Sequence, residues 1–168
     1  SPERPLRLIT IADMDYTDVS NDTVAHMTHL VHKEKQVDIV VHYGDISYAD
    51  ADQPHWDDYF RKIEPIAAYV PYMTTPGNHE LPWNFTAYRH RLIMPRPGLG
   101  APEHALYYTF NVGPVSFLML DSETWDDAPD IDAVQKGWAT EVLGAANTLD
   151  VRPYRPFIFV FQHRPFYC

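Results

Sequence analysis

The sequence is short of cysteine, glycine and basic residues. It has one Cys, which is also the last residue, and this count alone does not settle the redox compartment. Only 7 Gly stand against 15 Pro, a ratio that favours long ordered loops over a flexible array. The 13 Lys and Arg residues are outnumbered by 23 Asp and Glu, and the resulting net charge of −10 argues against a nucleic acid or an anionic membrane surface as partner.

Long hydrophobic runs are also missing. No stretch approaches the ~20 apolar residues of a membrane-spanning helix, and no signal peptide is recognisable. The 168 residues are 45% apolar, which is enough for one domain with a sizeable core. Two Asn-X-Thr sequons, at Asn21 and Asn84, are compatible with N-glycosylation and therefore with secretion.

Apolar runs alternate with amphipathic stretches along the chain. Runs rich in β-branched and aromatic residues predict strands over residues 6–12, 38–43, 69–75, 107–112, 115–120 and 156–161. The Gly113-Pro114 pair predicts a hairpin between the fourth and fifth of these strands. Helices are predicted over residues 21–35, 54–68, 85–94 and 131–146, and a loop over residues 95–102. This alternation predicts a layered α/β fold with mostly buried strands.

The first and last of these helices carry specific predictions. Asn21 or Asp22 is expected to cap the first helix. We interpret its His26, His29 and His32 as a solvated polar face rather than a zinc site. The buried stripe of the last helix is expected at Val134, Trp138, Val142 and Ala145.

Four of the expected strands end in residues that can bind a metal ion. These residues are Asp13, Asp45 with Tyr48, Asn78 with His79, and His163. Each alone has an ordinary interpretation as a turn, cap or packing residue. In open α/β sheets, however, ligands bind at the carboxyl ends of the strands, so four such strand ends in order indicate one shared site.

This set of side chains suits a pair of metal ions. Asp45 lies between the flanking donors and is the natural bridge between the two ions. Asp13 and Tyr48 offer hard oxygen donors, as a trivalent iron prefers, whereas the amide oxygen of Asn78 and the imidazole of His163 suit a borderline divalent ion.

The same residues carry a resemblance to a known family. Asp13, the Gly44-Asp45-x-x-Tyr48 motif, the Gly77-Asn78-His79-Glu80 motif and His163 resemble the calcineurin-like metallophosphoesterase superfamily. Tyr48 narrows the resemblance to the purple acid phosphatases, and the wording of the motifs is similar to the eukaryotic iron- and zinc-type members. The similarity spans almost the whole chain.

The resemblance implies a β-sandwich flanked by helices that holds Fe(III) beside Zn, Mn or Fe(II). It implies that Asp13, Asp45 and Tyr48 bind the iron, and that Asp45, Asn78 and His163 bind the divalent ion. His79 would contact the substrate phosphate and assist the leaving group. The implied activity is hydrolysis of phosphate monoesters by attack of a metal-bound hydroxide, commonly in mild acid.

Two departures from the family's motif pattern limit which residue roles the resemblance implies for this chain. The family usually has Gly two residues after the first Asp, where this chain has Asp15; we interpret Asp15 as a solvent-facing loop residue, the alternative being an added carboxylate at the iron site. The family's final Gly-His-x-His is absent as well. We therefore expect residues 1–168 to be the N-terminal portion of a catalytic domain, truncated before the final His ligands, and to bind metal weakly on their own.

Several alternatives stay open at this point. The main hypothesis is a secreted or endolysosomal/vacuolar acid phosphatase acting on a phosphate-ester small molecule or a phosphoprotein. A phosphodiesterase or nucleotidase of the same superfamily is disfavoured by Tyr48, and a catalytically impaired secreted binding module is the third hypothesis. His42 is interpreted as a packing residue, the weaker alternative being a role in supporting Asp45. Trp56 and Trp83 are interpreted as core or rim packing residues, the alternative being that they line the cleft. The physiological substrate, the divalent metal and the oligomeric state do not follow from the sequence.

Overall fold

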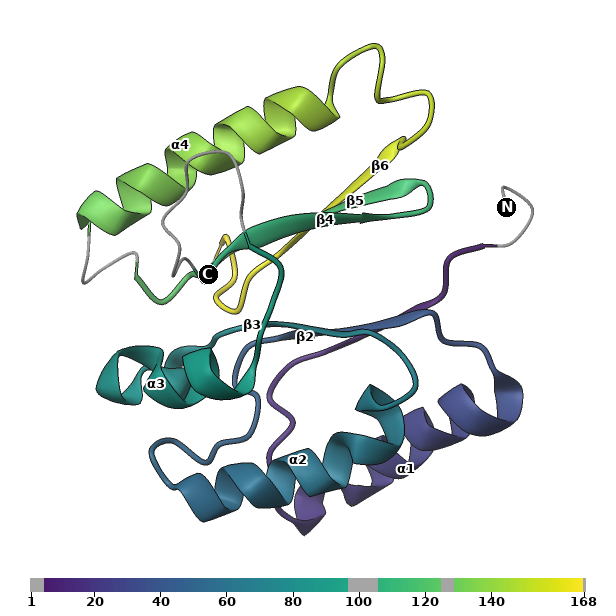
Figure 1. Cartoon of the computed structure of the whole chain (residues 1–168), viewed down its shortest axis with the longest axis vertical. Helices are drawn as coiled ribbons and strands as arrows, with labels where there is room; N and C mark the ends of the chain where they lie inside the picture. Colours follow the sequence, from purple (N-terminus) through teal and green to yellow (C-terminus); the bar gives the residue numbers. More distant parts are fainter. Residues whose placement is uncertain (1–4, 97–105, 125–128, 168) are drawn as a thin grey trace.

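The computed structural model describes residues 5–96, 106–124 and 129–167, and these form two three-stranded sheets with helices on the outside (Figure 1). The first sheet is parallel, in the order β1 (Leu8–Ile11), β2 (Ile39–Tyr43), β3 (Tyr72–Thr75). The second has the order β4 (Tyr108–Val112), β5 (Val115–Met119), β6 (Phe157–Phe161). Strand β5 pairs antiparallel with β4, as the hairpin prediction requires, and parallel with β6.

The helices lie on both outer faces of the pair of sheets. A 3-10 turn, η1 (Asp18–Ser20), leads into α1 (Asn21–His29), which continues as the π-helical turn η2 (Leu30–Glu34). Helix α2 (Gln53–Ala67) lies beside α1 on the outer side of the first sheet (Figure 1). The 3-10 turn η3 (Asn78–Glu80) and α3 (Pro82–Arg91) follow β3, and α4 (Pro129–Ala146) covers the second sheet.

Alternation along the strands separates three layers of core. On β2, Val40 packs outward with residues of α1, α2 and α3, whereas its neighbour Val41 packs inward between the sheets. On β5, Phe117 joins that inner layer, whereas Leu118 packs outward with Trp138 of α4. Successive strand residues point to opposite faces, so both central strands are buried on both faces. The predicted β-sandwich flanked by helices is confirmed.

Six strands and four helices lie where the sequence predicted them, but some details differ. Neither Asn21 nor Asp22 caps α1: the helix begins at Asn21 directly after η1, so the cap position is Ser20, whose side chain makes no capping bond. Thr17 caps η1, and its hydroxyl accepts from the Val19 amide.

His26 and His29 are exposed, in agreement with a solvated face. For His32 that prediction is wrong, because its ring is half-buried with Nε2 2.6 Å from the Pro65 carbonyl oxygen and packs edge-on against Tyr69. The predicted 95–102 loop lies mostly outside the described residues.

The buried stripe of α4 is narrower than predicted. Trp138 and Val142 are buried, but Val134 is 48% exposed and Ala145 is exposed as well. Gln135 is buried instead, and its side chain bonds the backbone of Asp121 in both directions at 2.8 Å. The stripe is therefore centred one residue further along the chain, and the two mispredicted positions fall at its edges.

Strand β6 also departs from the expectation of buried strands. Phe157 is 54% exposed, and Phe159 and Val160 are each 37% exposed. Among the described residues β6 is the outer strand of its sheet, paired on one side only, so part of its apolar surface faces outward.

Candidate metal centre

Loops from both sheets meet at the carboxyl ends of β1, β2, β3 and β6. The loops that follow β1 and β2 run side by side. The Asp13 amide donates to the Gly44 carbonyl and the Met14 amide donates to the Asp45 carbonyl, each at 3.2 Å. Asp13 and Asp45 are thereby held next to each other, although 32 positions separate them in the chain.

Two glycines permit the close approach of the other loops. A Cβ added at Gly44 would lie 2.4 Å from Nδ1 of His163, and one added at Gly77 would lie 2.3 Å from the Asp45 amide nitrogen. Gly44 also has a φ of +97°, which side-chain-bearing residues rarely adopt. These contacts bring the β3 and β6 loops against Asp45.

The side chains converge on one point. Ligand atoms of Asp13, Asp45 and His163 all lie within 4.8 Å of one another. Nε2 of His163 is 3.5 Å from Oδ1 of Asp45 and 3.2 Å from the amide oxygen of Asn78. The Tyr48 hydroxyl donates to Oδ1 of Asp13 at 2.7 Å. All five predicted ligands thus lie at a single cluster.

Asp45 is buried at the middle of this cluster, with a side chain 5% exposed. Burial alone raises the pKa of the Asp45 carboxyl. Hydrogen bonds from the His163 side chain and the His79 amide, together with the electrostatic attraction of the two imidazole rings, outweigh burial and lower this pKa. The same hydrogen bond to Asp45 raises the pKa of His163 to about 9. The site therefore stabilises an ionised carboxylate at its centre.

Tyr48 has the opposite electrostatics. Burial, the hydrogen bond to Asp13 and the negative charge of Asp45 raise the pKa of its phenol above the ordinary value. A phenolate at this position consequently requires a nearby cation in place of the proton.

The backbone at the cluster is strained. Asp13, Asp45 and Tyr48 all have left-handed φ values, of 56°, 47° and 54°. Non-glycine residues in this region cost on the order of 1 kcal/mol each and concentrate at functional sites. The surrounding hydrogen bonds and contacts hold these conformations in place.

His79 lies at the rim of the cluster, with its ring 4.3 Å from that of Tyr48. Its Nδ1 is 2.8 Å from Oδ1 of Asp50, and its Nε2 is 3.9 Å from Oδ2 of Asp45. Because a carboxylate only accepts, Nδ1–H donates to Asp50 and the Nε2 side faces the cluster. The sequence reasoning missed Asp50, although it closes the same Gly44–Asp50 loop.

The remaining candidates take ordinary roles. Asp15 turns away from the cluster and accepts from the Thr17 amide at 2.9 Å and the Thr17 hydroxyl at 2.6 Å. Its φ of 74° explains why a Gly would also suit this position. His42 is fully buried, with Nδ1 3.1 Å from the hydroxyls of Tyr59 and Tyr72, and burial lowers its pKa to about 3. It is a neutral packing residue.

The two tryptophans differ from each other. Trp56 is fully buried in the first-sheet core, as predicted. Trp83 is 79% exposed, so the interpretation of this side chain as a packing residue is wrong. It stands with Asn84 and Phe85 on a left-handed turn at the start of α3 (φ 54–58°), a conformation that periodicity does not reveal.

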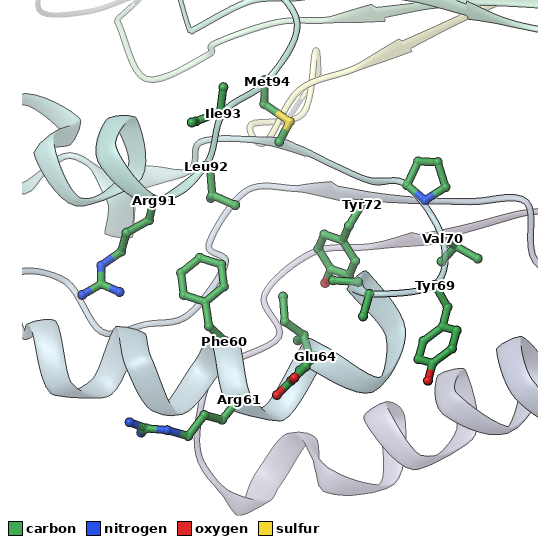
Figure 2. A pocket seen from close by; sticks show the side chains of 14 residues that line it. Phe60, Arg61, Glu64, Tyr69, Val70, Tyr72, Arg91, Leu92, Ile93 and Met94 are labelled. Atoms are coloured by element: carbon green, nitrogen blue, oxygen red, sulfur yellow. The ribbon is translucent and has the colours of Figure 1, made fainter.

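A separate pocket of about 800 Å³ lies away from this cluster (Figure 2). Residues of α2 such as Phe60 and Glu64, the start of β3 and the segment from Arg91 to Met94 surround it. None of the candidate metal ligands lines this pocket. The candidate functional residues therefore lie at the strand ends and not in the pocket.

The donor set fits a pair of metal ions. It offers oxygens from two carboxylates, a phenol and an amide, with one imidazole nitrogen, grouped around a buried carboxylate. Hard oxygens suit a trivalent ion, and mixed nitrogen and oxygen donors suit a divalent one. A two-sheet α/β sandwich with such a cluster at its strand ends defines the class of metal-dependent hydrolases.

Comparison with known proteins identifies the family within this class. The model of the calcineurin-like phosphoesterases matches residues 6–168. The chain belongs to the calcineurin-like phosphoesterase family. It is 35% identical over 162 residues to acid phosphatase type 7 of Danio rerio and 31% identical over 170 residues to purple acid phosphatase 22 of Arabidopsis thaliana. The resemblance stated from the motifs is thereby confirmed.

The chain spans only about a third of these relatives: 91% and 97% of it align with 35% and 36% of their lengths. Among solved structures, a purple acid phosphatase (PPD1) from yellow lupin seeds matches 95% of this chain and 30% of its own, with a TM-score of 0.78 and 22% identity. GAP50 of Plasmodium matches 97% of this chain and 56% of its own, with a TM-score of 0.65 and 15% identity. Both structures share the fold.

Proposed function

We propose that the protein is a dinuclear-metal acid phosphatase that hydrolyses phosphate monoesters. The observation that carries this proposal is the convergence of Asp13, Asp45, Tyr48, Asn78 and His163 at one edge of the sandwich. Relatives named acid phosphatases support the reaction class.

The ligands divide into two sets that share Asp45. Asp13, Asp45 and Tyr48 would hold Fe(III), and Asp45, Asn78 and His163 would hold Zn, Mn or Fe(II). When bound, such ions activate water as a nucleophile and neutralise charge on the phosphoryl group. Asp45 contributes the buried negative charge that both ions require.

His79 and Asn78 are the proposed substrate-binding residues, and His79 is the proposed catalytic acid. Its Nε2 faces the cluster, so it can hydrogen-bond a phosphate oxygen and give a proton to the leaving group. Asp50 positions the ring by accepting the hydrogen bond of Nδ1–H at 2.8 Å.

The proposal extends to the whole protein. Since the chain spans about a third of its relatives, we propose that it is the N-terminal portion of the catalytic domain, and that further ligands come from the remaining portion. Substrates would be phosphate-ester small molecules or phosphoproteins. The described residues contain no helix long and apolar enough to cross a membrane.

Exposed sequons support a secreted or endolysosomal/vacuolar location. Asn21 and Asn84 are both exposed, so both are proposed N-glycosylation sites. Treatment of the secreted protein with an N-glycosidase should lower its mass, and Asn21→Gln and Asn84→Gln should each remove one glycan.

A binding module without catalysis is the second candidate. It is favoured by the fold shared with GAP50, which is described as the anchor in the inner membrane complex of Plasmodium. The phosphodiesterase alternative is disfavoured by Tyr48.

One assay separates these functions. The complete protein that carries this chain is loaded with iron and zinc and assayed at pH 5 with p-nitrophenyl phosphate and with bis(p-nitrophenyl) phosphate. The phosphatase proposal predicts fast monoester hydrolysis that Asp45→Asn abolishes. Preference for the diester would favour the phosphodiesterase, and inactivity with both substrates would favour the binding module.

A further inference from the structure

Glu80 is a buried carboxylate beneath the metal cluster that the proposed reaction does not use. It is 1% exposed and directly follows the Asn78-His79 pair. A carboxylate rarely occupies such a position unless it is hydrogen-bonded, so its contacts indicate what it does.

Both oxygens of Glu80 accept hydrogen bonds from backbone amides of two different loops. Oε1 accepts from the Ile46 amide at 3.0 Å, and Oε2 accepts from the Gly77 amide at 2.8 Å. Ile46 directly follows Asp45, and Gly77 directly precedes Asn78. Glu80 belongs to the loop that carries Asn78, so its bond to Gly77 closes that loop locally and its bond to Ile46 ties it to the loop that carries Asp45.

The two loops have no freedom to approach further. The Cβ absent at Gly77 would already lie 2.4 Å from Oδ1 of Asp45, and the His79 amide donates to that oxygen at 3.0 Å. Steric contact sets the minimum separation of the loops, and the hydrogen bond from the Ile46 amide to Glu80 opposes any increase. The distance between Asp45 and Asn78 is thus fixed from both directions.

We propose that Glu80 is a positioning residue that sets the spacing of Asp45 and Asn78 and thereby the affinity of the divalent ion. The inference rests on the proposed function, which assigns both residues to that ion. The two hydrogen bonds that Glu80 accepts come from Ile46 and Gly77, and neither involves Asp13 or Tyr48, so the iron side depends on Glu80 less.

The chemistry of the side chain explains why a carboxylate is needed. Two amide donors require two acceptor oxygens, which the carboxyl group of Glu80 provides. In Glu80→Gln one acceptor becomes an NH₂ group that faces an N–H, and the loops must separate. Glu80→Asp keeps two acceptors but is one methylene shorter, so it cannot reach both amides equally well.

The test measures zinc affinity in the complete protein, by competition with a chromogenic chelator, for wild type, Glu80→Gln and Glu80→Asp. Loss of an outer partner of a metal ligand weakens binding about 10- to 100-fold, and we expect this range for Glu80→Gln and a smaller loss for Glu80→Asp. Saturating zinc should restore most of the kcat of Glu80→Gln. The iron colour should persist in both variants.

Asp121→Asn is the matched control. Asp121 is also a buried carboxylate, 3% exposed, but it accepts from the Glu123 amide in the loop that follows β5 of the second sheet. This variant should keep the zinc affinity of the wild type. Wild-type affinity in a folded Glu80→Gln, an equal loss in the control, or failure of both Glu80 variants to fold would overturn the proposal. A wild type that binds no zinc would instead overturn the proposed function.

Discussion

At the scale of single residues, proton positions decide how the site can work. Tyr48 donates its proton to Asp13, and His79 donates one to Asp50. The first proton has to leave before the phenol can bind a metal, whereas the second only orients a ring. The two aromatic side chains touch, yet their carboxylate partners give them different tasks.

Asp50→Asn tests the orientation of His79. The amide has one acceptor oxygen where the carboxylate has two, and its NH₂ group cannot accept from Nδ1–H, so it fixes the ring less firmly. General acid catalysis contributes about 10²- to 10⁴-fold, and we expect kcat to fall about 10- to 100-fold with metal content unchanged. Steady-state kinetics and metal analysis on the same sample check this. Unchanged kcat would remove Asp50 from the mechanism.

Asp121 gives the fold a pH dependence. Burial, followed by the charge of Glu123, raises the pKa of this carboxyl from 3.8 to about 6. A carboxyl with a raised folded-state pKa favours the fold when protonated. The stabilisation of the fold by protonated Asp121 is fully present below about pH 4 and is lost as the pH rises through about 6.

Asp121→Asn should therefore stabilise the protein at pH 7.5 by about 3 kcal/mol, because the pKa rises from 3.8 to about 6 and each pKa unit corresponds to about 1.36 kcal/mol. The gain should disappear near pH 4, where Asp121 is neutral in the fold. Urea unfolding of both proteins at the two pH values measures the difference. A pH-independent difference would contradict the assigned cause.

The sequence predicts a site residue where that residue belongs to a recognisable motif. Asp13, Asp45, Tyr48, Asn78 and His163 were all named in advance. Asp50 and the contacts of Glu80 were not, because their roles depend on distances between loops about 30 positions apart. The exposure of Trp83 was missed for a related reason, since nothing local announces left-handed φ at three consecutive non-glycine residues.

At the scale of elements, loop contacts matter more than the strands themselves. The apolar runs predicted every strand, because buried strands need β-branched and aromatic residues. They did not predict that β6 is partly exposed or that the stripe of α4 is centred one residue later. The exposure of β6 and the position of the buried stripe on α4 both depend on which neighbouring element covers each face of that strand or helix.

Gly77→Ala tests the contact between the β2 and β3 loops. Its Cβ would lie 2.3 Å from the Asp45 amide nitrogen, so the loops must separate. We expect a stability loss of about 1–3 kcal/mol, as for overpacking, with strongly weakened metal binding. Gly137→Ala in α4 meets no atom within 4 Å and should be neutral or stabilising. Equal metal affinity in Gly77→Ala would contradict the close contact.

At the scale of the whole molecule, the cluster of candidate metal ligands connects the two sheets. His163 follows β6 of the second sheet, and Asp45 follows β2 of the first, and they meet at 3.5 Å. The pairing of β6 with β5 could not be derived from the sequence, since about 40 residues separate these strands and only packing selects the partner.

Metal removal should therefore loosen the whole fold. A metal ion whose free concentration is 100 times its dissociation constant stabilises the folded protein by about 2.7 kcal/mol. Chelation of the complete protein should lower its Tm by several degrees, and added zinc should reverse the change. A Tm that does not respond to chelation would show that the ligand cluster holds no ion.

A visible absorption spectrum of the complete protein, with metal content determined on the same sample, tests the dinuclear assignment most directly. The assignment predicts a purple charge-transfer band with one iron and one divalent ion per chain, and it predicts that Tyr48→Phe abolishes the band while the divalent ion remains. A colourless protein with two divalent ions, or a coloured Tyr48→Phe variant, would contradict Tyr48 as the iron ligand, and a metal-free wild type would contradict the metal centre itself.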